Sequence, residues 1–240
     1  MMKNHSTVRT LFVFIVAGIF AAAIMVASYL AAQTTIPTKP TPNKSISSKS
    51  QMGSQIVAQG TARGAVACAR CHGFDGASDG SGAFPRLDGQ SAQYLAEQLR
   101  HFASGHRQNA LMQPIAKGLN DDEIGAVAQY YASLHAVPFP SRPVPAQLRD
   151  RGKQVAEVGD FSVRVQACES CHGPNGEGEP ISGVPYLGGQ YSHYISIQIQ
   201  MFRQGYRKSQ QMFVPAHNLN EQDIIAVADY FEQASRPAMK

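Results

Sequence analysis

The second half of this chain repeats the first half at an offset of 100 residues, and the repeat constrains the fold more than any other feature. CARCH at 68–72 recurs as CESCH at 168–172, and PRLDGQ at 85–90 recurs as PYLGGQ at 185–190. A long internal repeat indicates one structural unit present twice. Beyond these motifs the register continues without a gap: Tyr94, Phe102, Gly105, Arg107, Met112, Leu119, Asn120, Ile124, Val127, Ala128 and Tyr130 match Tyr194, Phe202, Gly205, Arg207, Met212, Leu219, Asn220, Ile224, Val227, Ala228 and Tyr230.

A proline-rich segment joins the two copies. HAVPFPSRPVPAQ carries prolines at 138, 140, 143 and 145, and proline disfavours helix and stiffens an extended chain. A length of 240 residues suits two small domains plus a targeting segment. We therefore predict a first domain at residues 55–137, a linker at 138–145 and a second domain at 146–240.

The N-terminal region predicts export. Residues 1–10 form a basic flank, and residues 11–32 are an uncharged apolar run that would span about 33 Å as a helix. This length is enough for a bilayer core of ~30 Å. We interpret the run as an uncleaved transmembrane anchor; the alternative is a cleaved signal peptide, and in both cases the rest of the chain reaches the periplasm. Residues 33–54 are rich in Thr, Ser, Pro and Lys, which predicts a disordered tether.

The positive net charge does not indicate nucleic-acid binding. The first acidic residue is Asp75, and five basic residues precede position 53. Without those five, the formal charge of +4 becomes −1 for residues 53–240. The globular part therefore lacks the basic surface that a nucleic acid requires.

Each half reads as helices joined by long loops, so we expect an all-α fold. Apolar residues at helical spacing predict a helix from Ser91 to Gly105 and a counterpart from Tyr191 to Gly205. Asn120 and Asn220 are predicted to cap the last helix of each half. No segment shows the alternation of a strand. The glycine-rich loop at 73–89 is too long for so small a domain unless something large fills the space it encloses.

The two C-x-x-C-H motifs predict covalent attachment of haem c. The thiols of Cys68 and Cys71, and of Cys168 and Cys171, are spaced to add to the two vinyl groups of a haem. His72 and His172 then become the proximal iron ligands. The alternatives are a zinc site, a redox dithiol or a disulfide, but zinc normally takes four protein ligands and a redox dithiol has no need of the histidine.

Met112 and Met212 are the predicted distal iron ligands. Each lies forty residues beyond its histidine, and they are the only methionines paired at the repeat offset. We place them in a polar loop before the last helix. Filling both axial positions from the protein leaves no open site for a substrate, so the haems should carry electrons. The competing histidines have no histidine partner at the offset: His101, His106, His135, His193 and His217.

Further side chains are candidates to surround the haems. A carbonyl near Pro85 or Pro185 is a plausible acceptor for the Nδ1 proton of the proximal histidine. The arginines are candidates to pair with propionates and the tyrosines to line the pockets, although ordinary solvated or core roles are equally open for them: Arg86, Arg107, Arg207, Tyr94, Tyr194, Tyr130 and Tyr230.

On these motifs the chain resembles the dihaem cytochrome c4 family over residues 55 to about 236. The resemblance implies two tandem class I cytochrome c domains related by a pseudo-twofold axis, haem propionates facing each other across the interface, and electron transfer to a terminal oxidase in the bacterial periplasm. One departure concerns the proline after the methionine, which shifts from Pro114 to Pro215, so the second methionine segment is expected to differ in shape.

The function we expect is therefore that of an electron carrier and not of an enzyme. Its partners would be a redox protein donor and a terminal oxidase, with the membrane contacted through the N-terminal helix and with no nucleic acid or small-molecule substrate. Two alternatives stay open. One is a dihaem oxidoreductase of the peroxidase or thiosulfate dehydrogenase type, and the other is a fixed electron-transfer subunit of a membrane complex.

Overall fold

A computed structural model describes residues 44–136 and 142–234 of the 240-residue chain. From Ser45 onward the described residues belong to one compact unit. The predicted basic flank, transmembrane segment and first part of the tether lie outside these residues, as does the first half of the predicted linker, residues 138–141. In the ranges that are described, no helix has both the length and the apolar character to cross a bilayer.

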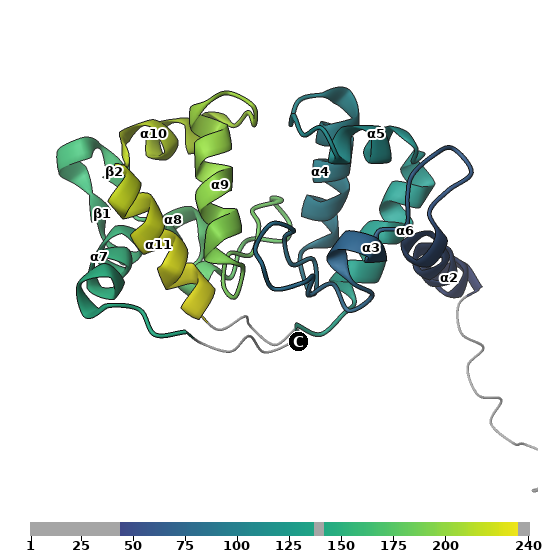
Figure 1. The fold of residues 1–240 in the computed structure, drawn as a ribbon, viewed down its shortest axis with the longest axis horizontal. Coiled ribbons are helices and arrows are strands. Elements are labelled where there is room, and N and C mark those ends of the chain that lie inside the picture. Colours follow the sequence, from purple (N-terminus) through teal and green to yellow (C-terminus); the bar gives the residue numbers. More distant parts are fainter. Residues whose placement is uncertain (1–43, 137–141, 235–240) are drawn as a thin grey trace, which may run out of the picture. The chain divides into compact units, whose positions relative to one another are not determined.

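Both halves are mostly helical, as predicted (Figure 1). The first half contains α2 (Lys44–Gln59), α3 (Ala69–His72), α4 (Ala92–Ser104), α5 (Met112–Lys117) and α6 (Asp121–Ala132). The second half contains α7 (Ala146–Glu157), β1 (Gly159–Asp160), the 3-10 turn η1 (Phe161–Val163), β2 (Val165–Gln166), α8 (Glu169–His172), the 3-10 turn η2 (Pro174–Gly176), α9 (Ser192–Arg203), α10 (Gln210–Asn218) and α11 (Glu221–Gln233).

Local caps set the ends of the long helices. The Ser91 hydroxyl accepts a hydrogen bond from the backbone N–H of Tyr94 at the start of α4, and Gly105 ends the helix with a φ of 78°. The backbone of any residue other than glycine would be strained at that φ. Asn120 and Glu123 form the reciprocal capping box of α6. The predicted helix boundaries and caps are therefore confirmed here.

Each half has its own apolar core. Ile56 and Val57 of α2 pack with residues of α4 and α6 in the first half, and Val155 of α7 packs with α9 and α11 in the second. The closing helices carry the two largest of the fully buried side chains, Tyr131 and Phe231, each 1% exposed. Burial of this kind supplies most of the stability of short helices, which are marginal in isolation.

The first helix of each half lies very close to the closing helix. A Cβ added to Gly53 would lie 2.4 Å from the carbonyl oxygen of Ala126, and one added to Gly152 would lie 2.2 Å from that of Ala226. Only glycine permits this approach. The predicted disordered tether extends through residue 54, but α2 begins at Lys44. The prediction is therefore wrong for residues 44–54, which form the first part of a helix whose later residues Ile56 and Val57 pack in the core.

The two halves differ in two places. A two-residue antiparallel hairpin pairs Gly159 with Gln166 and Asp160 with Val165, so the expectation of no strands is wrong for this short segment. The methionines lie in helices and not in the predicted loops: α5 begins at Met112, whereas α10 begins two residues before Met212 and contains Pro215. The shifted proline thus accompanies a longer helix, which confirms the expected difference in shape.

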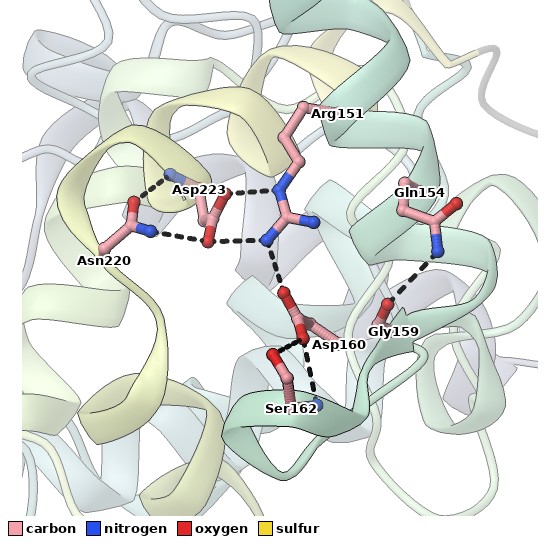
Figure 2. A network of polar contacts seen from close by, with 7 residues as sticks. All are labelled: Arg151, Gln154, Gly159, Asp160, Ser162, Asn220 and Asp223. Carbon is pink, nitrogen blue, oxygen red and sulfur yellow. Dashed lines mark hydrogen bonds and ion pairs between the residues drawn. The ribbon is translucent and has the colours of Figure 1, made fainter.

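A charged network fastens the hairpin of the second half to its helices (Figure 2). Arg151 of α7 donates to both carboxylate oxygens of Asp223 in α11, at 2.6 and 2.9 Å, and to Asp160 at 2.7 Å. Asn220 donates to the same Asp223 carboxylate at 2.9 Å. Because Gly53 and Gly152 occupy equivalent places, the first half carries Met52 where the second carries Arg151.

Candidate haem attachment sites

The attachment residues lie on a single helical turn in each half. Cys68 is the N-cap of α3, and Cys71 and His72 are its last two residues; Cys168, Cys171 and His172 are placed in the same way on α8. Gly73 and Gly173 follow with a φ of 73°, so the chain turns away directly after each histidine. One turn therefore presents two thiols and one imidazole from each copy.

The peptide carbonyl of the proline in each P-x-L-x-G-Q segment orients the histidine ring. His72 Nδ1 lies 3.1 Å from the Pro85 carbonyl oxygen, and His172 Nδ1 lies 3.2 Å from that of Pro185. Burial lowers the pKa of both imidazoles below the usual value, although the hydrogen bond itself raises it. The predicted acceptors are thus confirmed. Because a carbonyl oxygen can only accept a hydrogen bond, Nδ1 must carry the proton. Nε2 is then the ring nitrogen available to bind a metal.

The first thiol of each pair lacks the lowered pKa of a redox dithiol. All four cysteines are free of disulfides. Burial raises the pKa of the Cys68 thiol to about 11 and that of Cys168 to about 12, whereas a reactive dithiol needs a lowered pKa. Among the described residues no three His, Cys, Asp or Glu side chains gather to hold a metal ion. Two thiols on one turn beside an imidazole with an available Nε2 fit covalent haem attachment.

Met112 and Met212 occupy matching places near the start of their helices. The backbone N–H of Met112 donates to the Asn109 side chain at 2.8 Å, and that of Met212 donates to the Ser209 hydroxyl at 3.3 Å. Both methionines are partly buried, and exposed apolar residues stand next to them, Leu111 at 65% and Phe213 at 57%. A partly buried thioether beside exposed apolar side chains fits a haem edge better than a packed core.

Four of the seven candidate arginines and tyrosines meet between the two halves. Arg107 donates to the Tyr194 hydroxyl at 2.7 Å, and Arg207 donates to the Tyr94 hydroxyl at 2.8 Å. Both guanidinium groups also donate to side chains of Gln98 and Gln198. Each arginine lies over the ring of a phenylalanine in its own half, 4.5 Å from its centroid, Arg107 over Phe102 and Arg207 over Phe202.

The other candidates lie elsewhere. Arg86 is buried in an ion pair with Asp88, and it also donates to the Gly189 carbonyl of the other half at 3.2 Å. The hydroxyl of Tyr130 donates to the Phe74 carbonyl at 3.0 Å. That of Tyr230 donates to Glu169 at 2.9 Å and to Glu157 at 3.1 Å. These three residues, Arg86, Tyr130 and Tyr230, therefore lie outside the cluster formed by the other four candidates.

Sequence reasoning missed the role of two glutamines. Gln90 and Gln190 are 3% and 4% exposed, and each reaches the backbone of the other half. The signal was present, because glutamine closes the P-x-L-x-G-Q segment in both copies. Nothing in a local pattern, however, indicates a partner about a hundred residues away.

Comparison with known proteins decides the family. Residues 55–130 match the model of cytochrome c oxidase, cbb3-type, subunit III, and residues 150–235 match the cytochrome c model. The chain is 33% identical to cytochrome c4 of Pseudomonas aeruginosa, over 73% of this chain and 87% of that protein. The chain belongs to the dihaem cytochrome c4 family. It is also 38% identical to a thiosulfate dehydrogenase electron acceptor of Stutzerimonas stutzeri, over 75% of this chain and 84% of that protein.

The fold agrees with this membership. The crystal structure of reduced cytochrome c4 from Pseudomonas stutzeri superposes with a TM-score of 0.68 at 29% identity, covering 78% of this chain and 98% of that one. The two tandem cytochrome c domains, each with its C-x-x-C-H motif, imply two covalent haem c groups. This cytochrome is a dihaem electron carrier of the cytochrome c4 or thiosulfate dehydrogenase electron acceptor type.

Proposed function

We propose that this cytochrome carries electrons in the bacterial periplasm, from a redox protein donor to a terminal oxidase, through two haems that are each held by histidine and methionine. The proposed axial pairs are His72 with Met112 and His172 with Met212. Cys68, Cys71, Cys168 and Cys171 provide the covalent attachment. The family membership supports the carrier role, and the periplasmic location rests on the apolar segment at residues 11–32, which predicts export.

One observation carries the proposal: each copy offers an oriented imidazole and, at the same offset, a half-buried thioether. Bound haem supplies a one-electron couple, and the protein sets its potential. A thioether as the second axial ligand raises that potential, and two protein ligands close the iron to substrates. The polypeptide then acts by orienting the histidine through the proline carbonyl and by covering the haem with apolar side chains.

The direct test replaces Met112 and Met212 separately by alanine in the dihaem protein. Each change should remove one of two methionine-sulfur charge-transfer bands and lower the potential of one haem. Met201, a methionine of α9 with no methionine at the repeat offset, provides the control as Met201→Leu. Survival of both bands in either alanine variant would show that these methionines are not the ligands.

We further propose that residues 11–32 hold the cytochrome at the inner membrane, because the apolar run is longer than the apolar region of an ordinary signal peptide, which has about 7–15 residues. Intact-mass analysis of the protein purified from membranes checks this. A mass that includes residues 1–32 is expected, and a mass that begins after residue 32 would show cleavage.

A second candidate function follows from the 38% identity to a thiosulfate dehydrogenase electron acceptor. In this case the donor is a thiosulfate dehydrogenase. Thiosulfate alone should leave the ferric cytochrome oxidised, whereas thiosulfate with catalytic amounts of such a dehydrogenase should reduce both haems. Reduction by thiosulfate alone would instead favour a catalytic dihaem protein.

A further inference from the structure

Each domain holds a backbone segment of the other with one glutamine side chain. Gln190 donates from Nε2 to the Arg86 carbonyl at 2.9 Å and accepts at Oε1 from the Arg86 N–H at 3.0 Å. Gln90 does the same to Tyr186, with both distances 3.0 Å. The two contacts are related by the same 100-residue offset as the sequence repeat. Each domain therefore contributes one glutamine and one contacted backbone segment.

The peptide group that Gln190 contacts is the one that orients a proximal histidine. The Arg86 N–H and the Pro85 carbonyl belong to the same peptide bond, and that carbonyl accepts from His72 Nδ1 at 3.1 Å. A continuous chain therefore runs from the imidazole of the first domain, through one peptide group, to a side chain of the second. Tyr186, Pro185 and His172 form the same chain toward Gln90, with the histidine bond at 3.2 Å.

Such chains polarise cooperatively. A peptide N–H that donates to an acceptor makes its own carbonyl a stronger acceptor. A stronger acceptor at Nδ1 makes a metal-bound imidazole more electron-donating, which favours the ferric state. The effect is well defined here, because Oε1 of each glutamine is fixed by a second donor, the N–H of Ser91 or Tyr191 at 3.0 Å.

We propose that Gln90 and Gln190 are positioning residues that tune the haem of the opposite domain: Gln190 lowers the reduction potential at His72, and Gln90 lowers it at His172. The proposal rests on the proposed role of the two histidines as iron ligands. It makes domain docking part of the control of potential, since separation of the domains would break both chains and raise both potentials.

The test compares Gln190→Met and Gln90→Met in the dihaem protein. Methionine keeps the volume and removes both hydrogen-bonding groups. Redox titrations followed by the haem methyl signals of each domain should show a crossed pattern. Gln190→Met should raise the ferrous to ferric ratio of the first-domain haem about threefold to tenfold at a fixed potential, tenfold being about 59 mV for one electron. Gln90→Met should do so for the second-domain haem.

A second measurement separates tuning from loosened packing. In the diamagnetic ferrous protein, the Nδ1 proton of His72 should move upfield in Gln190→Met and stay in place in Gln90→Met. Gln190→Glu keeps an acceptor oxygen for the Arg86 N–H. The reduction potential of the first-domain haem in this variant should therefore equal that of the unaltered protein or lie below it. Equal shifts at both haems, a shift in the glutamine's own domain, or a rise with glutamate equal to that with methionine would each overturn the proposal.

Failure of this proposal and failure of the axial assignment are distinguishable. If the axial pairs are wrong, the methionine-sulfur bands persist after Met112→Ala and Met212→Ala. If only the glutamine relay is wrong, those bands respond as expected and the crossed potentials are absent.

Discussion

Replacing Arg151 by methionine should destabilise the second domain far more than Arg63→Met, which breaks the corresponding charge pair, destabilises the first. Methionine is the residue that the first domain carries at the equivalent place, Met52, so the change fits a helix of this type. It removes the centre of the network in Figure 2, where one guanidinium group joins Asp160 and Asp223.

The magnitude follows from burial. The Asp223 side chain is 6% exposed and accepts two of the Arg151 hydrogen bonds. Breaking a fully buried pair costs about 3–5 kcal/mol. Two features lower this cost in free energy of unfolding. Arg151 is 36% exposed, and Asp223 keeps the hydrogen bond from Asn220 at 2.9 Å after the change. We expect a loss of about 2 kcal/mol in the free energy of unfolding.

The first domain supplies a matched control. Glu123, the counterpart of Asp223, pairs with Arg63, which is 50% exposed. An exposed pair contributes about 0–1 kcal/mol, so Arg63→Met should have a small effect. Urea unfolding of the dihaem variants, followed by circular dichroism and the methionine-sulfur bands, measures both losses. Equal losses in the two variants, or a loss below 1 kcal/mol for Arg151→Met, would refute the reasoning from burial.

Three further predictions test separate parts of the molecule. Cys68→Ala should weaken covalent haem retention in the first domain only, as measured by mass spectrometry of the denatured protein; equal loss from both domains would contradict independent attachment. The Ser162 hydroxyl, followed by Arg151, lowers the pKa of Asp160 to about 2. Its stabilising contribution should therefore be present above pH ~4 and be lost as the pH falls toward 2, and Ser162→Ala should show a smaller loss of melting temperature over that interval. Gly152→Ala should push α7 away from the Ala226 carbonyl, at a cost of about 1–3 kcal/mol, whereas Gly125→Ala, with open space around it, should be neutral or stabilising in thermal melts.

What the sequence predicted was set locally. The α4 helix and its caps follow from apolar spacing together with Ser91 and Gly105, and these signals lie within fifteen residues of one another. The turn that carries Cys68 and His72, and the proline carbonyl thirteen residues later, could be predicted because the motif recurs. The repeat gave each assignment an independent second copy.

What the sequence did not predict depends on packing or on very short elements. The start of α2 is rich in serine and lysine and looks disordered, yet Ile56 and Val57 of the same helix anchor it in the core. The hairpin at 159–166 has strands of only two residues, too short for any alternation. The methionine helices are hard to tell from loops in the sequence, because α5 has only six residues and α10 contains Pro215.

Contacts between the domains join the two similar halves into one compact unit. Arg107 and Arg207 bring two guanidinium groups into one polar cluster, and the acceptors the structure gives them there are the neutral side chains of tyrosine and glutamine. Buried positive charge of this kind is costly without an anion, and the family resemblance implies haem propionates facing this interface. The hydrogen-bond chains from Gln190 to His72 and from Gln90 to His172 also cross from one domain to the other. Loading of one haem should therefore stabilise the docking that orients the other, and this coupling would be absent from either domain alone.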